Sequence, residues 1–282
     1  MTRKSKVNIF DSTIEKQVAT GVTLVAEKYR ALHKMSLAGD FVAPAVVSVD
    51  PGGNQLTLER IHGVESIRNQ YYKYMVDQIE PKEILGLFNR VGRILARIHH
   101  ELEERPEAQD WKPSDSFLVA VEQYGVEHLI NPLDQQSVQL HGDYGFANVL
   151  VRQGQENDFD IVIIDPCEDG YSCRHDWCRG PRYVDIGKML LSIEGKVPVG
   201  WQRKIDQDKV CRLQHAFLVG YEDASGLKLN QSLCFAYAYA LGFCYFLNRF
   251  PFYYRVAITI MYNRILRGNF PLKNKLAKIG AI

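Results

Sequence analysis

Three polar residues near the middle of the chain have the types and the spacing that a phosphoryl-transfer site requires. Asp143 stands five residues before Asn148 in the segment LHGDYGFANVLV, and Asp165 ends the apolar run IVIID. In phosphoryl transfer, one carboxylate orients the acceptor hydroxyl and takes its proton, while an amide and a second carboxylate hold Mg²⁺ against the nucleotide phosphates. Mg²⁺ prefers oxygen ligands and takes few of them from the protein. The three residues therefore predict a magnesium-dependent phosphotransferase site.

A β-hairpin is expected to position these residues. Residues 148–152 (NVLVR) and 160–165 (DIVIID) are rich in β-branched side chains and flank the polar stretch QGQEND. Two such runs around a short polar stretch are typical of a hairpin. The catalytic base and one metal ligand would lie on the loop before the first strand, and the other ligand at the end of the second strand. Such an arrangement fixes the distance between them.

Upstream of the hairpin, the sequence predicts two helices and a second hairpin. Apolar residues recur at helical spacing over 22–35 and from Pro81 to residue 98. Ser12 is a candidate cap for a helical stretch near the N-terminus. Two β-rich runs surround the Pro-Gly turn at 50–53, which indicates a hairpin.

The order of these elements predicts an α+β fold with two lobes. Residues 1–62 would form a small N-terminal lobe, and residues 63–282 a mainly helical lobe that is helix-rich from residue 183 onward. The two lobes would meet near His62 and Gly63.

Composition excludes several classes of protein. Of the 282 residues, 46% are hydrophobic and 24% are charged, as in ordinary globular proteins. The formal net charge of +1 gives no reason to expect attraction to nucleic acid. The longest apolar run, 232–247, is shorter than the roughly 20 residues of a membrane span, so a buried helix is expected there. Six cysteines are too few for a disulfide scaffold, and the N-terminus does not resemble a secretion signal, which predicts a cytoplasmic location.

Several segments, taken in order, resemble a known family. His-Gly-Asp at 141–143 with Asn148, followed by Ile-Asp at 164–165, resembles the catalytic core of the aminoglycoside phosphotransferase and choline kinase branch of the protein-kinase-like superfamily. The segment YVDIGKML at 183–190 resembles the family's helix that begins with an aspartate. Weaker matches are AEKYRAL, the hinge-like LTLERIHG and the helix VGRILARIHHE. The resemblance covers residues 22 to 195 and implies a two-lobed protein-kinase-like fold.

The resemblance implies a role for each residue of the core. Asp143 would be the catalytic base, and Asn148 and Asp165 would be the Mg²⁺ ligands. His141 and Asp185 would be structural braces of the catalytic loop.

The nucleotide-binding residues are less clearly marked. Glu27 would orient a lysine onto the phosphates of ATP, but the chain has no Gly-rich phosphate loop and only 26 residues precede Glu27. We therefore expect an abbreviated N-terminal lobe, with Lys6 as the leading phosphate lysine and Lys4 and Lys16 as alternatives. Backbone groups from residue 59 to residue 61 would receive the adenine. The expected nucleotide contacts are Lys6, Glu27, Glu59 and Ile61.

The segment 166–182 (PCEDGYSCRHDWCRGPR) allows three interpretations. Three thiolates and an imidazole could form a tetrahedral zinc site, although no Cys-x-x-Cys pair is present. Unligated thiols on a loop are the second interpretation. In the third, arginines contact an anionic acceptor, since guanidinium matches the geometry of carboxylate and phosphate. The cysteines and histidine are Cys167, Cys173, His175 and Cys178, and the arginines are Arg174, Arg179 and Arg182.

These observations predict an ATP- and Mg²⁺-dependent phosphotransferase that acts on a hydroxyl of a small molecule, such as a sugar or an amino alcohol. One alternative is a pseudokinase that binds partners without turnover, which the missing Gly-rich loop favours and the complete core opposes. Another is a kinase for a protein or an envelope saccharide. Acceptor pockets follow no short motif, so the sequence identifies neither the acceptor nor the oligomeric state.

Overall fold

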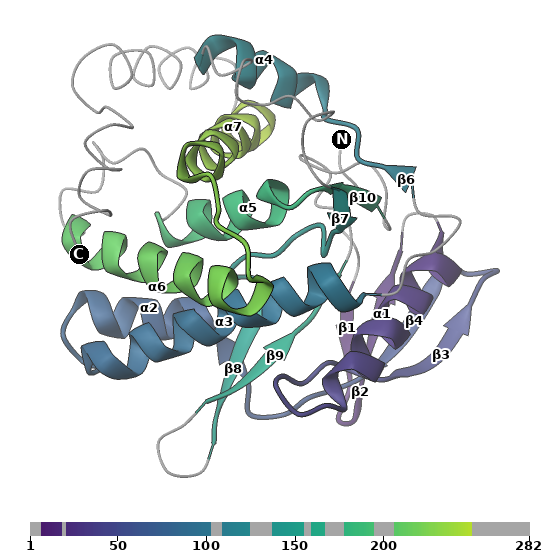
Figure 1. Ribbon diagram of the computed structural model, residues 1–282. Helices are drawn as coiled ribbons and strands as arrows, with labels where there is room; N and C mark the ends of the chain where they lie inside the picture. The colour runs from purple at the N-terminus through teal and green to yellow at the C-terminus, as the bar shows by residue number, and fades with distance from the viewer. Residues whose placement is uncertain are drawn as a thin grey trace.

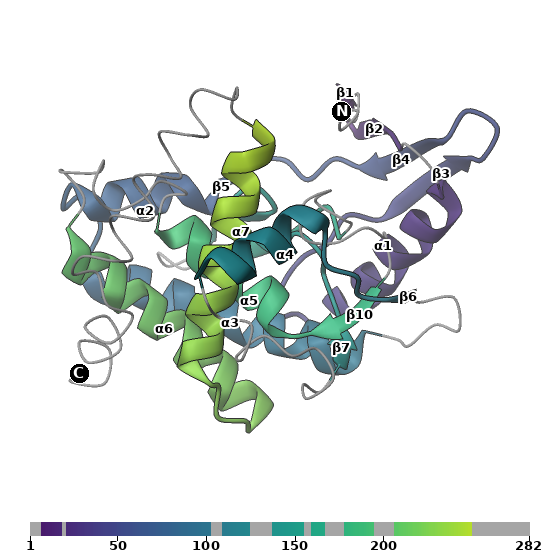
Figure 2. The same ribbon diagram turned by 90° about the horizontal axis from the view of Figure 1, so that it is seen from above.

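The structure is a computed structural model that describes residues 7–18, 21–102, 109–124, 137–154, 159–166, 178–194 and 206–249. Figure 1 shows a twisted sheet with a helix beside it at the N-terminal end, and a group of helices that makes up most of the rest of the described chain. Seen from above in Figure 2, the N-terminal sheet and its helix lie to one side of the helical part.

The N-terminal sheet has four antiparallel strands in the order β1-β2-β4-β3. Helix α1 packs against the sheet, and apolar residues of both, among them Val25, Tyr29 and Leu56, form a small core. The elements are β1 (Val7–Ile9), β2 (Thr13–Gln17), α1 (Val22–Ser36), β3 (Val46–Asp50) and β4 (Gln55–Glu59).

The predicted helix over 22–35 and the predicted hairpin around 50–53 are confirmed by α1 and by the β3–β4 pair. The prediction that Ser12 caps a helix is wrong, because residues 13–17 form strand β2. This strand pairs with β4 along its whole length, from Thr13 opposite Glu59 to Gln17 opposite Gln55. The five-residue segment is too short to show a period by itself, so pairing with β4 decides its conformation.

Six helices follow. Helix α3 begins with Pro81 at its first position and carries an acid in its first turn, as the sequence predicts. It packs along α6, and two glycines allow the close approach: a Cβ on Gly92 would lie 2.0 Å from the carbonyl oxygen of Phe217, and one on Gly220 would lie 2.0 Å from that of Asn89. The helices are α2 (Ile67–Met75), α3 (Pro81–Glu101), α4 (Asp115–Tyr124), α5 (Tyr183–Ile193), α6 (Gln207–Ser225) and α7 (Gln231–Arg249).

The part of the chain that the structure describes also contains two three-stranded sheets. In the first, β8 and β9 form the predicted hairpin, with Val149 opposite Ile163. The backbone of Val42, which follows α1, bonds to Ile161 and Ile163 of β9 and so ties the N-terminal part to this hairpin. The sheets are β5-β8-β9, of Glu65–Ser66, Val149–Gln153 and Phe159–Ile163, and β6-β10-β7, of Gln109–Asp110, Cys178–Pro181 and Ser137–Gln139.

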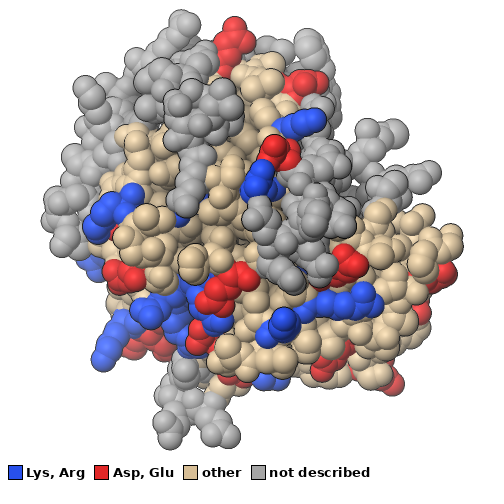
Figure 3. All heavy atoms as spheres, turned by 45° about the vertical axis from the view of Figure 1, so that its right-hand side comes forward, with Lys and Arg blue, Asp and Glu red and all other residues tan. Residues whose placement is uncertain are grey.

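The apolar run at 232–247 falls in α7, where Cys234, Phe235 and Leu241 are buried in the large core, as expected for a buried helix. Within the described ranges, no helix combines the length and the apolar character that crossing a membrane requires. On the face drawn in Figure 3, Lys and Arg side chains lie beside Asp and Glu side chains. The predicted lobe boundary near His62 and Gly63 stays a prediction.

Candidate active site

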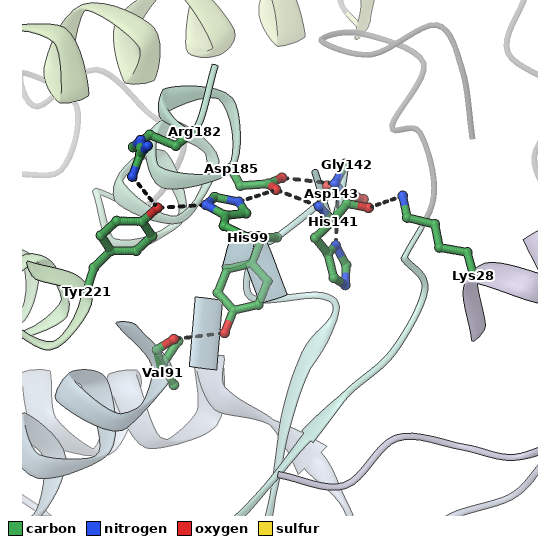
Figure 4. A network of polar contacts seen from close by, with 10 residues as sticks. Lys28, Val91, His99, His141, Gly142, Asp143, Arg182, Asp185 and Tyr221 are labelled. Atoms are coloured by element: carbon green, nitrogen blue, oxygen red, sulfur yellow. Dashed lines mark hydrogen bonds and ion pairs between the residues drawn. The ribbon is translucent and has the colours of Figure 1, made fainter. Parts of the chain in front are cut away.

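The loop that carries Asp143 is held by Asp185, in the first turn of α5 (Figure 4). The Asp185 carboxylate is fully buried and accepts hydrogen bonds from the backbone N–H groups of His141, at 2.7 Å, and Gly142, at 3.0 Å. Gly142 has a φ of +99°, which side chains disfavour, so glycine suits this turn. These two bonds join the loop to the first turn of α5, and the bracing role of Asp185 stays a prediction.

A second layer of polar groups supports Asp185. The Nε2 atom of His99 lies 3.0 Å from the Asp185 carboxylate, and its Nδ1 atom lies 2.9 Å from the hydroxyl of Tyr221, to which Arg182 donates at 3.4 Å. Burial lowers the pKa of His99. Burial opposes ionisation of Asp185, but the hydrogen bond from His99 and the bonds from the loop amides keep its pKa below the ordinary value. Asp185 is thus ionised and His99 neutral, with its Nε2 proton donated to the carboxylate.

His141 is fully buried, and burial lowers its pKa to about 4. The ring is therefore neutral at pH 7, and its Nδ1 atom lies 3.4 Å from the backbone N–H of Asp143. The carbonyl of His141 accepts a hydrogen bond of 3.0 Å from Lys28, a fully buried lysine of α1. These contacts support the predicted bracing role of His141 and tie α1 directly to the loop.

Asn148 and Lys188 are among the side chains that contact the Asp143 carboxylate. Asn148 donates from its amide nitrogen to one carboxylate oxygen at 3.0 Å and to the backbone carbonyl of Asp143 at 2.9 Å. The ammonium of Lys188, on α5, lies 2.9 Å from the other carboxylate oxygen. The Asp143 side chain keeps 27% of its surface exposed.

Asp165 lies where α1, β2 and the β8–β9 hairpin meet. Its backbone N–H donates to the hydroxyl of Tyr29 at 3.0 Å, and its carboxylate forms an ion pair with Lys16 of β2. The backbone N–H of Ile164 bonds to the carbonyl of Asn148 at 3.0 Å, so the predicted metal ligands are held by adjacent backbone groups. Asp165 has a φ of +55°, a left-handed conformation that Asp adopts more readily than most residues.

The donor atoms fit Mg²⁺. Asp165 offers a carboxylate, and the amide nitrogen of Asn148 is engaged by Asp143, which leaves the amide oxygen for a metal. Both are the hard oxygen ligands that Mg²⁺ prefers.

A cavity of about 390 Å³ opens beside Asp165, between the N-terminal sheet and the β8–β9 hairpin. Lys16 and Asp165 are the ion pair on its wall. Glu59 and Ile61, the predicted adenine contacts, line this cavity. The N–H of Ile61 donates to no acceptor among the described residues. The apolar lining includes Ile14, Leu58, Leu150, Val162 and Ile164.

Other expected residues are placed elsewhere. Glu27 is half-buried on α1 and pairs with no lysine of the described ranges. Arg182 belongs to the bracing network, and Arg179 pairs with Asp110 on the neighbouring strand at 3.1 Å. Lys4, Lys6 and Arg174 lie outside the described residues.

The zinc interpretation falls largely outside the structure. Cys167, Cys173 and His175 lie outside the described residues, and Cys178 is buried and disulfide-bonded, so its sulfur is not a thiolate. No group of three or more His, Cys, Asp or Glu side chains that could hold a metal occurs in the ranges that the structure describes. The cytoplasmic location stays a prediction, and a disulfide at Cys178 is more typical of oxidising compartments.

Sequence reasoning missed the roles of Lys28, Tyr29, His99 and Lys188. Lys28 stands four residues before Leu32, so helical spacing places it on the buried face of α1, and this spacing could have indicated its role. Lys188 stands one helical turn after Asp185, so the two side chains share a face of α5.

Comparison with known proteins supports the fold. No family model matches the chain, and no curated protein matches it by sequence. A crystal structure of glucosamine kinase is similar, with a TM-score of 0.58 and 14% identity over 95% of this chain and 75% of the other. Glucosamine kinase in complex with glucosamine, ADP and inorganic phosphate gives 0.55 and 13%, over 98% and 74%. The gentamicin–APH(2")-IIa complex gives 0.50 and 14%, over 99% and 88%.

The chain therefore has the α+β, kinase-like fold of these small-molecule phosphotransferases, which confirms the fold that the sequence resemblance implies. At this level of identity the likeness shows the fold alone.

Proposed function

We propose that this protein is an ATP- and Mg²⁺-dependent phosphotransferase that moves the γ-phosphoryl group of ATP to a hydroxyl of a small molecule. One observation carries the proposal: Asn148 bonds through its side chain to Asp143 and through its backbone to Ile164, the residue before Asp165. The proposed base and the two proposed oxygen ligands are thereby linked to one another, and Asp165 lines a cavity that also carries Lys16.

The cavity suits a nucleotide. Its apolar lining would accept the adenine, and the backbone near Ile61 would bond to the edge of the base. Lys16, which is 10% exposed, would exchange its contact with Asp165 for the phosphates when ATP binds. We therefore assign the phosphate-binding role to Lys16 in place of Lys6.

Asp165 and Asn148 would hold Mg²⁺, which supplies neutralisation of the charge on the phosphates. Asp143 would orient the acceptor hydroxyl and take its proton. The hydroxyl oxygen forms a bond to the γ-phosphorus while the bond from that phosphorus to the β–γ bridging oxygen breaks, and ADP leaves. The bracing by Asp185 and His99 keeps the base in place through the reaction.

The test is ADP production by the purified protein with Mg-ATP and a panel of sugars and amino alcohols, comparing the wild type with Asp143→Asn. A general base contributes about 10²- to 10⁴-fold to the rate. Asp143→Asn should therefore lower kcat by at least about 10²-fold and keep its affinity for ATP. Asp223→Asn, an exposed carboxylate on α6, is the control and should retain full activity. Tight Mg-ATP binding with no turnover on any acceptor would instead support the pseudokinase alternative, and transfer only to proteins or saccharides the other alternative.

A further inference from the structure

Lys188 of α5 contacts the carboxylate of Asp143 but has no role in the function proposed above. Lys188 lies three residues after Asp185, so one helix carries both the brace of the catalytic loop and a cation that reaches its base. The Lys188 ammonium is 2.9 Å from Asp143, and its side chain is only 9% exposed.

The stem of Lys188 is held by packing against the same loop. A Cβ on Gly145 would lie 2.9 Å from the hydroxyl oxygen of Ser192 and 3.6 Å from Cγ of Lys188, so the loop backbone rests directly on this face of α5. Ser192 in turn donates to the backbone carbonyl of Lys188 at 3.0 Å. A lysine packed in this way has few other positions for its ammonium.

The two oxygens of the Asp143 carboxylate are thus contacted from different elements. Lys188 reaches one oxygen from α5, and Asn148 reaches the other from the end of the loop. A carboxylate held at both oxygens cannot rotate freely about its χ2 torsion, so its orientation is the same each time an acceptor binds. Burying a charged ammonium is costly unless it is paired, so the contact is strongly favoured.

We propose that Lys188 is a positioning residue for Asp143, which fixes the orientation of the carboxylate towards the acceptor hydroxyl. This inference rests on the proposed phosphotransferase function. The hydroxyl proton passes to Asp143, so Lys188 takes no part in the proton transfer. Its removal should slow transfer without affecting the nucleotide, because the ATP cavity is lined by other elements.

The experiment measures kcat and both KM values for Lys188→Met, which removes the charge and retains an unbranched side chain. We expect kcat to fall by about 10- to 100-fold, the effect of misplacing a catalytic group, while the KM for ATP stays within about threefold. Lys209→Met is the matched control, because Lys209 is a similarly buried lysine, 16% exposed, that pairs with a different aspartate, Asp77, at 2.6 Å and lies on α6. It should lower stability to a similar extent and leave kcat unchanged.

A double-mutant cycle of Lys188→Met and Asp143→Asn completes the test. The two substitutions should be non-additive in kcat and in the free energy of unfolding, because the residues act as one unit. An unchanged kcat in a folded Lys188→Met, or additive effects, would overturn the positioning role while wild-type turnover still supports the proposed function. A wild type without turnover would overturn the proposed function and with it any catalytic role of Lys188.

Discussion

Asp185→Asn removes the negative charge at the centre of the bracing network with almost no change of volume. All three partners of the carboxylate, the backbone amides of His141 and Gly142 and the ring of His99, are donors. An asparagine offers one acceptor oxygen and an NH₂ group. Whichever way the amide turns, its NH₂ group faces at least one buried donor.

The cost follows from this mismatch. A buried donor without a partner costs about 1–3 kcal/mol, and hydrogen bonds to a neutral acceptor are weaker than those to a charged one by roughly 1 kcal/mol each. Asparagine is easier to bury than an ionised aspartate, which offsets part of the loss. We expect a net loss of about 2–4 kcal/mol in the free energy of unfolding, a large part of the 5–15 kcal/mol typical of a domain.

Urea unfolding at pH 7, followed by circular dichroism, measures this loss. Asp223→Asn on α6 is the control, because substitutions of exposed residues usually change stability by less than about 0.5 kcal/mol. Asp185→Asn should also lose roughly 100-fold in kcat, because the Asp185 carboxylate holds the backbone of the loop that carries Asp143. A loss of stability below about 1 kcal/mol together with wild-type kcat would refute the bracing role of Asp185.

Three further predictions concern the metal, the phosphates and pH. Asp165→Ala should abolish the Mg²⁺-dependent part of the thermal shift that ATP produces, and an undiminished dependence would remove Asp165 from the site. Lys16→Met should weaken Mg-ATP binding by about 1–3 kcal/mol in calorimetry, the range for hydrogen bonds to charged groups, whereas Glu27→Ala should change it little. The pKa of His141 is about 4 when folded, below the 6.5 of a free histidine, so stability is full above pH 6.5 and falls by about 3 kcal/mol towards pH 4. His141→Gln should flatten this part of the pH dependence, and an equally steep profile would contradict the assignment.

The sequence predicts the parts of the fold whose patterns are local. Helices α1 and α3 and the β8–β9 hairpin follow from apolar spacing and from start signals such as Pro81. Asp143 and Asn148 share one loop, so their proximity is also a local property.

Contacts between distant segments were harder to predict. Lys16 reaches Asp165 only because β2 pairs with β4 in a particular register, and a five-residue strand does not specify that register by itself. For this reason the sequence favoured Lys6 over Lys16 as the phosphate-binding lysine and predicted that Glu27 orients that lysine. Likewise, the sequence suggested Arg182 as a contact for an anionic acceptor. Its contact with Tyr221 depends on how α6 packs against α5, which the sequence does not show.

The central claim is that this chain transfers phosphate from ATP to a small-molecule hydroxyl with Asp143 as base. The most direct measurement is detection by mass spectrometry of a phosphorylated acceptor after incubation of hydroxyl-bearing metabolites with the protein and Mg-ATP. We predict that a phosphorylated product forms with the wild type, depends on Mg²⁺, and disappears with Asp143→Asn while ATP still binds. Phosphorylated product at the wild-type rate with Asp143→Asn, or its absence from every wild-type reaction while Mg-ATP binds, would contradict the account.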